Sequence, residues 1–177
     1  DAETAGSGLF PGEESPLEIL DKNPRSEGNL KHAILQNVAT ASDLDMAIRI
    51  VQASGLLLDD EAREYRAQLS RAIGEVEARH WFDGTAQIIN ERPILNGSGH
   101  LPRPDRVMLF PDGSAVVVDY KFGKVPENLN RYNNQVFGYV NALRKSGRFK
   151  NVKGYLWFVN ESRVFNVSGF VKDKQKP

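Results

Sequence analysis

The chain has 177 residues, no cysteine, and 23 lysine and arginine residues against 23 aspartate and glutamate residues. Its length suits one domain with a hydrophobic core, and the absence of cysteine excludes disulfides, thiol nucleophiles, zinc fingers and cysteine-ligated iron–sulfur clusters. No apolar stretch approaches the roughly 20 residues that span a bilayer, and no signal peptide follows Asp1, so we expect a cytoplasmic protein without a membrane partner. The missing initiating methionine suggests a processed or excised piece.

The zero net charge divides into two opposite parts. Residues 1–120 carry 20 acidic and 11 basic side chains, whereas residues 121–177 carry three acidic and 12 basic side chains. A basic C-terminal third indicates a polyanionic partner such as nucleic acid. The alternative is an uneven surface that ends in a solvated basic tail at 171–177.

The first half of the chain predicts an irregular lead-in followed by helices. Residues 1–25 are rich in glycine, proline and acidic side chains, which places a single domain at 26–170. Three amphipathic helices are expected next, the first after Ser26, the second after Ser42 and the third from Asp59.

The second half predicts strands, with one further helix at about 129–146 that ends at Gly147. A near-continuous apolar run follows the turn at 111–113, which predicts a strand buried on both faces. The order of elements indicates an α+β domain, in which a helix crosses a central mixed sheet. The expected strands are 86–95, 106–110, 115–120, 153–160 and 162–167.

Two carboxylates and a lysine stand at the ends of the two central strands. If these strands pair across the turn at 111–113, Asp105 and Asp119 face each other, and strand alternation places Asp119 and Lys121 on one side. Carboxylate oxygens bind hard divalent cations, and a lysine beside such a metal can orient or deprotonate water. The alternative is a surface ion pair, although a charge directly after four buried residues needs a partner.

These residues resemble the PD-(D/E)XK nuclease signature, and their surroundings resemble its RecB/AddA-type branch. The first aspartate lies in Pro104-Asp-Arg-Val107 and the second in Val118-Asp-Tyr-Lys-Phe-Gly123. Asp-x-Lys alone is a weak signal, but the ordered set of motifs across residues 27–167 is a strong one. The remaining matches are a helical histidine, a glutamate before the motif strands and a Gln-x-x-x-Tyr helix: His32, Glu91, Gln135 and Tyr139.

The resemblance implies a restriction-endonuclease-like fold, a central mixed sheet flanked by helices, and a metal site at the sheet edge. His32, Asp105 and Asp119 would bind Mg²⁺ or Mn²⁺, with the backbone carbonyl of Tyr120 as a further ligand. The two aspartates would be catalytic, together with Lys121, which would position the attacking water. A lone helical histidine is more often a core residue, so the ordered motifs, rather than His32 itself, support this assignment.

The same resemblance implies contacts beyond the metal. Gln135 would be catalytic or steady the active site, and Tyr139 would steady it or touch the nucleic-acid backbone. Lys124 and Arg131, two cations of the basic third, are further predicted nucleic-acid contacts. Glu91 is either functional or purely structural.

Two histidines and two departures from the family pattern also bear on the site. His80 is expected to pack beside Trp81, and His100 is a competitor of His32 for the metal. Leu101-Pro-Arg-Pro104 replaces a common glycine, which predicts a shorter or bent strand before Asp105. Phe122 replaces the common threonine after Asp-Tyr-Lys, and the lack of cysteine indicates a branch without an iron–sulfur cluster.

The function implied by the resemblance is that of a Mg²⁺-dependent deoxyribonuclease of the exonuclease type, a hydrolase. It would act on single-stranded DNA as the C-terminal nuclease module of a UvrD/Rep-like helicase–nuclease in recombination and repair. Its partners would be DNA and a helicase motor in the same polypeptide or complex. The alternative is a catalytically silent nuclease-fold module that binds DNA or docks a protein. Polarity, endonuclease or exonuclease action and the choice between DNA and RNA stay open.

Overall fold

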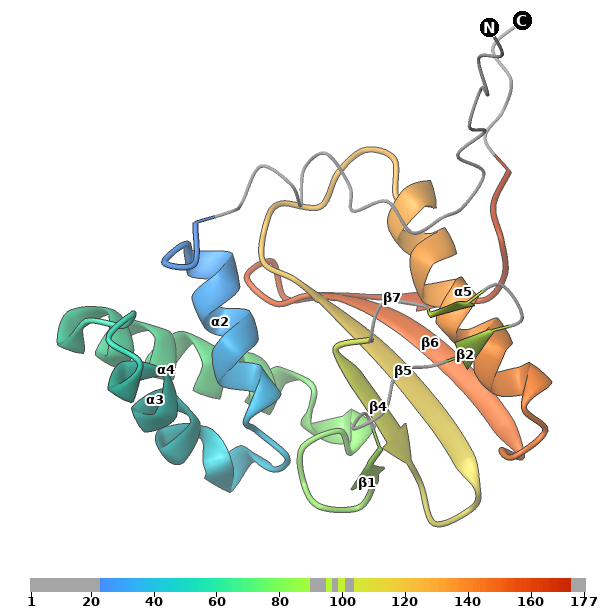
Figure 1. The fold of residues 1–177 in the computed structure, drawn as a ribbon, viewed down its shortest axis with the longest axis horizontal. Helices are drawn as coiled ribbons and strands as arrows, with labels where there is room; N and C mark the ends of the chain where they lie inside the picture. The colour runs from blue at the N-terminus through green and yellow to red at the C-terminus, as the bar shows by residue number, and fades with distance from the viewer. Residues whose placement is uncertain (1–22, 90–94, 97–98, 101–103, 173–177) are drawn as a thin grey trace, which may run out of the picture.

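The computed structural model of the protein describes residues 23–89, 95–96, 99–100 and 104–172, and Figure 1 shows its fold. The helices of this part are α2 (Glu27–Gln36), α3 (Leu44–Ala53), α4 (Asp59–Glu75) and α5 (Asn130–Lys145), with 3-10 turns at Ala41–Asp43 and Glu77–Arg79. The strands are β1 (Gln87–Ile88), β2 (Leu95–Asn96), β3 (Gly99–His100), β4 (Arg106–Leu109), β5 (Ser114–Lys121), β6 (Asn151–Phe158) and β7 (Arg163–Val167).

The main sheet has five strands in the order β1-β4-β5-β6-β7, and β2 pairs separately with β3. Strands β5 and β6 are parallel, whereas the other neighbouring pairs of the main sheet are antiparallel. A parallel pair needs a long return connection, and α5 supplies it. The predicted mixed sheet crossed by a helix is therefore confirmed.

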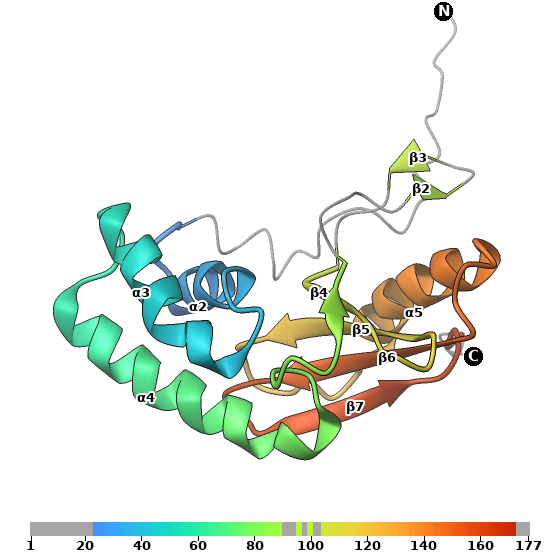
Figure 2. The ribbon, with the colours of Figure 1, turned by 90° about the horizontal axis from the view of Figure 1, so that it is seen from below.

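Two hydrophobic layers cover the sheet, and Figures 1 and 2 show α2, α3 and α4 gathered on one side with α5 on the other. Side chains at even positions of β5, such as Val116 and Val118, pack with the three N-terminal helices. Those at odd positions, such as Ala115 and Val117, pack with α5. Every residue of β5 from 115 to 120 is buried, as the apolar run predicts.

The local signals explain where several elements begin and end. The Ser26 hydroxyl accepts a hydrogen bond from the backbone N–H of Asn29, which caps α2. Gly113 and Gly147 adopt left-handed backbone angles, with φ of 86° and 68°, in the β4–β5 turn and after α5.

Arg106 joins the helical layer to β4. Its side chain is buried, and the guanidinium donates hydrogen bonds to the carbonyls of Val38, Ala39 and Trp81 at 2.7, 2.6 and 2.6 Å. The guanidinium carbon also lies 4.1 Å from the centre of the Phe82 ring. The arginine of the Asp-Arg-Val motif thus fixes the start of β4 against the chain that follows α2.

Some strand boundaries differ from the prediction. In the described part of the chain, β1 covers two residues of the predicted 86–95, and residues 90–94 lie outside that part. Strand β6 begins at Asn151, two residues before the predicted start, because parallel pairing with β5 extends back to Ser114. Among the described residues, every helix is too short or too polar to cross a lipid bilayer.

Candidate active site

The register of β4 and β5 brings the two motif aspartates together. Arg106 pairs with Val118, so the positions just beyond this pair, Asp105 and Asp119, lie opposite each other. Asp119 is 6% exposed, at the end of the most buried strand. The predicted juxtaposition of the two carboxylates is therefore present in the structure.

Lys121 reaches back along the same face of β5 to Asp119. Its Nζ lies 2.9 Å from Asp119 Oδ2 and 4.1 Å from the centre of the Tyr132 ring. Asp119 Oδ2 is buried and accepts no well-aligned hydrogen bond, despite the nearby ammonium. A buried carboxylate oxygen with unused acceptor capacity fits a site that receives a further cation.

His32 approaches Asp105 from α2, on the other layer of the molecule. Its Nε2 lies 3.3 Å from Asp105 Oδ2, which also accepts the backbone N–H of Tyr120 at 2.8 Å. The other ring nitrogen, Nδ1, lies 3.1 Å from the carbonyl of Gly28. Because a carbonyl can only accept, Nδ1 carries a proton, and Nε2 is the nitrogen left to bind an acid or a metal.

Burial and neighbouring charges shift the pKa values of the two carboxyl groups. Desolvation raises the pKa of Asp119 to about 8, the charge of Asp105 adds to this rise, and Lys121 opposes it. Burial also acts to raise the pKa of Asp105, but the hydrogen bond and charge of His32, together with hydrogen bonds to Asp119 and the Tyr120 backbone, leave the pKa lowered. Burial acts to lower the pKa of His32, but Asp105, the charge of Asp119 and the Gly28 carbonyl together leave it raised. The two carboxyl groups therefore share too little positive charge for both to ionise freely.

The arrangement as it stands is not a completed metal centre. Within the part of the chain that the structure describes, no three His, Cys, Asp or Glu side chains are gathered closely enough to hold a metal ion. Asp105 instead bonds directly to His32, and Asp119 pairs with Lys121. The donor atoms are carboxylate, imidazole and carbonyl groups, which are ligand types that divalent metal ions accept.

Gln135 and Tyr139 lie one turn apart on α5, behind the carboxylates. Tyr139 is 2% exposed. The pKa of Tyr139 is raised, first by burial and then by the charges of Asp119 and Asp105. Tyr139 of the predicted Gln-x-x-x-Tyr pair therefore lies close enough to the two carboxylates for their charges to act on it.

The remaining predicted residues fall into three groups. Lys124 and Arg131 are exposed, in the loop after β5 and in the first turn of α5. Glu91 and the side chain of His100 lie outside the described residues. The expectation for His80 was wrong, because its ring bonds to Asp83 with 60% of the side chain exposed rather than packing in the core.

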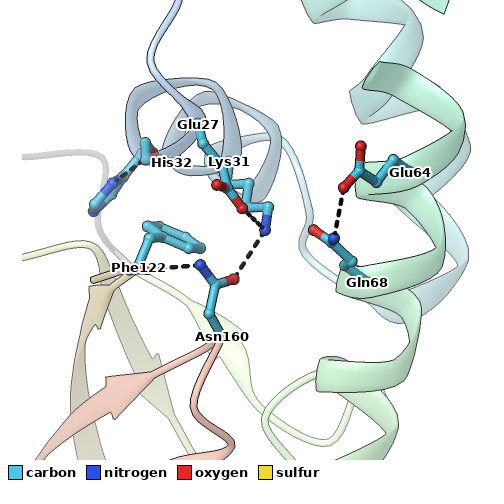
Figure 3. Close-up of polar contacts among 8 residues, drawn as sticks. Glu27, Lys31, His32, Glu64, Gln68, Phe122 and Asn160 are labelled. Atoms are coloured by element: carbon cyan, nitrogen blue, oxygen red, sulfur yellow. Dashed lines mark hydrogen bonds and ion pairs between the residues drawn. The ribbon is translucent and has the colours of Figure 1, made fainter. Parts of the chain in front are cut away.

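Sequence reasoning missed two residues near the site, Lys31 and Asn160. Figure 3 shows Lys31 beside His32 on α2, bonded to Glu27 and to Asn160. The spacing of Glu27 and Lys31 is that of a helical ion pair, a signal that was available in the sequence. Asn160 lies in the turn after β6, where no local pattern predicts a partner 129 positions away.

The comparisons with known proteins agree with this geometry. The family model of the PD-(D/E)XK nuclease superfamily matches residues 12–176. A comparison with curated proteins finds no match. The mixed five-stranded sheet with helices on both faces is consistent with the restriction-endonuclease-like fold of that superfamily. With the match covering most of the sequence and the motif aspartates paired at the end of β5, the chain belongs to the PD-(D/E)XK nuclease superfamily.

Proposed function

We propose that the domain is a metal-dependent DNA nuclease that hydrolyses phosphodiester bonds at the end of β5. The observation that supports this most is the buried carboxylate pair of Asp105 and Asp119, with Lys121 at 2.9 Å from Asp119. Burying two facing carboxylates costs free energy, and groups perturbed in this way cluster at functional sites. A divalent cation between them would offset that cost.

The ligands proposed for Mg²⁺ or Mn²⁺ are His32 Nε2, the carboxylates of Asp105 and Asp119, and the carbonyl of Tyr120. When bound, such a cation polarises phosphoryl oxygens and lowers the pKa of a coordinated water. The Gly28 carbonyl accepts from Nδ1 of His32, so Nε2 would act as the ligand after it leaves Asp105 and gives up its own proton.

The remaining residues have roles that follow from their positions. The ammonium of Lys121 would orient the attacking water and offset negative charge that develops on the phosphate, while the Tyr132 ring holds it in place. Because Tyr139 is buried, we assign it with Gln135 to steadying the carboxylates rather than to touching a strand. The exposed Lys124 and Arg131 are the proposed contacts to the DNA backbone.

A wider role as the nuclease module of a helicase–nuclease in recombination and repair is part of this proposal. The RecB/AddA-like motifs and the basic C-terminal third support it, because a motor would feed single-stranded DNA across a cationic surface. On this view the domain is a cytoplasmic, exonuclease-type hydrolase. The competing proposal is a catalytically silent module that binds DNA or docks a protein.

A cleavage assay separates these functions. End-labelled single-stranded DNA, duplex DNA, circular single-stranded DNA and RNA are incubated with Mg²⁺, Mn²⁺ or EDTA. We expect metal-dependent cleavage of linear single-stranded DNA that Asp119→Ala and Lys121→Ala reduce by at least about 100-fold. Arg49→Ala, which removes an exposed cation of α3 outside the basic C-terminal third, is the matched control. A wild-type protein that binds DNA but cuts none of these substrates with either metal supports the silent module.

A further inference from the structure

The mechanism proposed above does not use the buried charge of Lys31. Lys31 is 0% exposed, and its Nζ donates hydrogen bonds to Glu27 Oε1 at 2.6 Å and to Asn160 Oδ1 at 2.9 Å. The ammonium also lies 5.1 Å from the centre of the Tyr65 ring. A lysine inside the protein is costly unless it is paired, so its presence calls for a reason beyond packing.

Asn160, which accepts a hydrogen bond from Lys31, also binds the backbone at the end of β5. Its Nδ2 donates to the carbonyl of Phe122 at 2.6 Å, and the preceding Val159 N–H donates to the carbonyl of Lys121 at 2.9 Å. The backbone that directly follows the Asp-Tyr-Lys motif is thus held at two successive carbonyls by the end of β6.

The side chain of Phe122 packs against α2. Its ring meets the imidazole of His32 edge-on, with the ring centres 4.8 Å apart and the planes at 74°. Figure 3 shows His32 and Lys31 reaching from the same helix toward Phe122 and Asn160. The contacts form a closed circuit from Lys31 through Asn160 and Phe122 to His32. A threonine in place of Phe122 has no ring to complete it.

We infer that Lys31, Asn160 and Phe122 are positioning residues that set the place of His32 relative to the carboxylates of the sheet. The inference rests on the proposed metal-dependent function. His32 belongs to the helical layer, whereas Asp105 and Asp119 belong to the sheet, so a shared metal demands that the two layers keep a fixed register. The circuit joins the two layers through Lys31, which precedes His32 on α2, and through Phe122, which follows Lys121 at the end of β5.

The substitution Lys31→Met separates a positioning role from a purely structural one. Lys31→Met keeps the apolar stem and removes the buried ammonium, while the partners left behind are solvated: the Glu27 side chain is 51% exposed, and Asn160 is exposed. Replacing a buried charge with an apolar side chain of similar size is often neutral or stabilising. Lys31→Met therefore keeps or raises the resistance to unfolding while it loosens His32.

The experiment measures metal affinity and stability separately on the full chain. Isothermal titration with MnCl₂ gives the affinity, thermal unfolding in EDTA gives the stability, and kcat and KM are determined on single-stranded DNA. For Lys31→Met and Asn160→Leu we expect Mn²⁺ binding about tenfold weaker, as for other groups that orient metal ligands, with KM for DNA unchanged. The control is Asn134→Leu, because the Asn134 side chain also makes hydrogen bonds to another segment, two with Val171 at 2.9 and 2.8 Å, besides one from Asn133.

The possible results either support or overturn the positioning role. Weaker Mn²⁺ binding by Lys31→Met at unchanged or higher stability, with Asn134→Leu binding as the wild type does, supports the positioning role. Wild-type affinity in both Lys31→Met and Asn160→Leu overturns it and leaves the nuclease proposal standing. Affinity and stability that fall together in these variants, as they would for a structural contact, also overturn it. A wild-type protein that binds no Mn²⁺ overturns both proposals.

Discussion

Replacing Arg106 by leucine is expected to weaken the fold while the metal-binding side chains stay in place. The variant leaves the carbonyls of Val38, Ala39 and Trp81 without their donor and removes the contact with the Phe82 ring. Hydrogen bonds to a charged group contribute roughly 1.5 kcal/mol or more each, so three of them correspond to a loss of at least about 4.5 kcal/mol. That is a large share of the roughly 5–15 kcal/mol that stabilises a typical domain.

The measurement is urea unfolding in EDTA, followed by tryptophan fluorescence. Arg144→Leu is the comparison, because Arg144 donates one hydrogen bond to a backbone carbonyl, that of Val152 at 2.9 Å. We expect that variant to lose about 1 kcal/mol, and Arg106→Lys to fall between the two. If Arg106→Leu unfolds at the wild-type urea concentration with an unchanged slope, the reasoning about the buried carbonyls is refuted.

Three further predictions concern packing and pH. Gly154→Ala places a Cβ 2.6 Å from a methyl of Val140, so the side chain of Val140 or the backbone must shift, and we expect the free energy of unfolding to fall by about 1–3 kcal/mol in urea titrations. An unchanged midpoint contradicts the close approach. The hydrogen bonds of Asp83 to Thr85 and His80 lower its pKa to about 2, so its stabilising contribution is present above pH 4 and lost as the pH falls toward 2. Asp83→Asn should therefore have a lower Tm than the wild type at pH 6 but not at pH 2, and equal Tm values at pH 6 argue against the interaction. In EDTA, the raised pKa of Asp119 destabilises the folded protein increasingly as the pH rises from about 4 to 8, because the buried carboxyl group must then ionise. Asp119→Asn should therefore have a higher Tm than the wild type at pH 8 and the same Tm at pH 4. A lower Tm than the wild type at pH 8 contradicts the proposed cost of ionising Asp119.

Much of the fold could be predicted because the decisive signals are local. The cap at Ser26, the turn at 111–113 and the continuous apolar run of β5 each follow from a few neighbouring residues. Strand alternation was enough to place Asp119 and Lys121 on one face, and the ion pair between them confirms it. The boundaries of β6 were less accurate, because they depend on register with a strand more than 30 positions earlier.

The parts of the site that local patterns could not reveal depend on contacts between layers. Arg106 was recognised as part of a motif, but its three carbonyl partners come from segments that the fold brings together. The same holds for Lys31, which reads as a surface cation of an amphipathic helix until the β6–β7 turn is placed over it. A single sequence gives no measure of such distant pairings.

The length of β5 also keeps the turn between β4 and β5 far from the carboxylate pair. The turn at 111–113 lies at the start of β5, and the eight residues of that strand separate it from Lys121 by about 23 Å at the usual rise per residue. Asp112 is exposed and bonds to Ser114 within the turn. A fluorophore or surface linker attached through Asp112→Cys in this cysteine-free chain would therefore leave the carboxylate end open, so single molecules could be immobilised in one defined orientation.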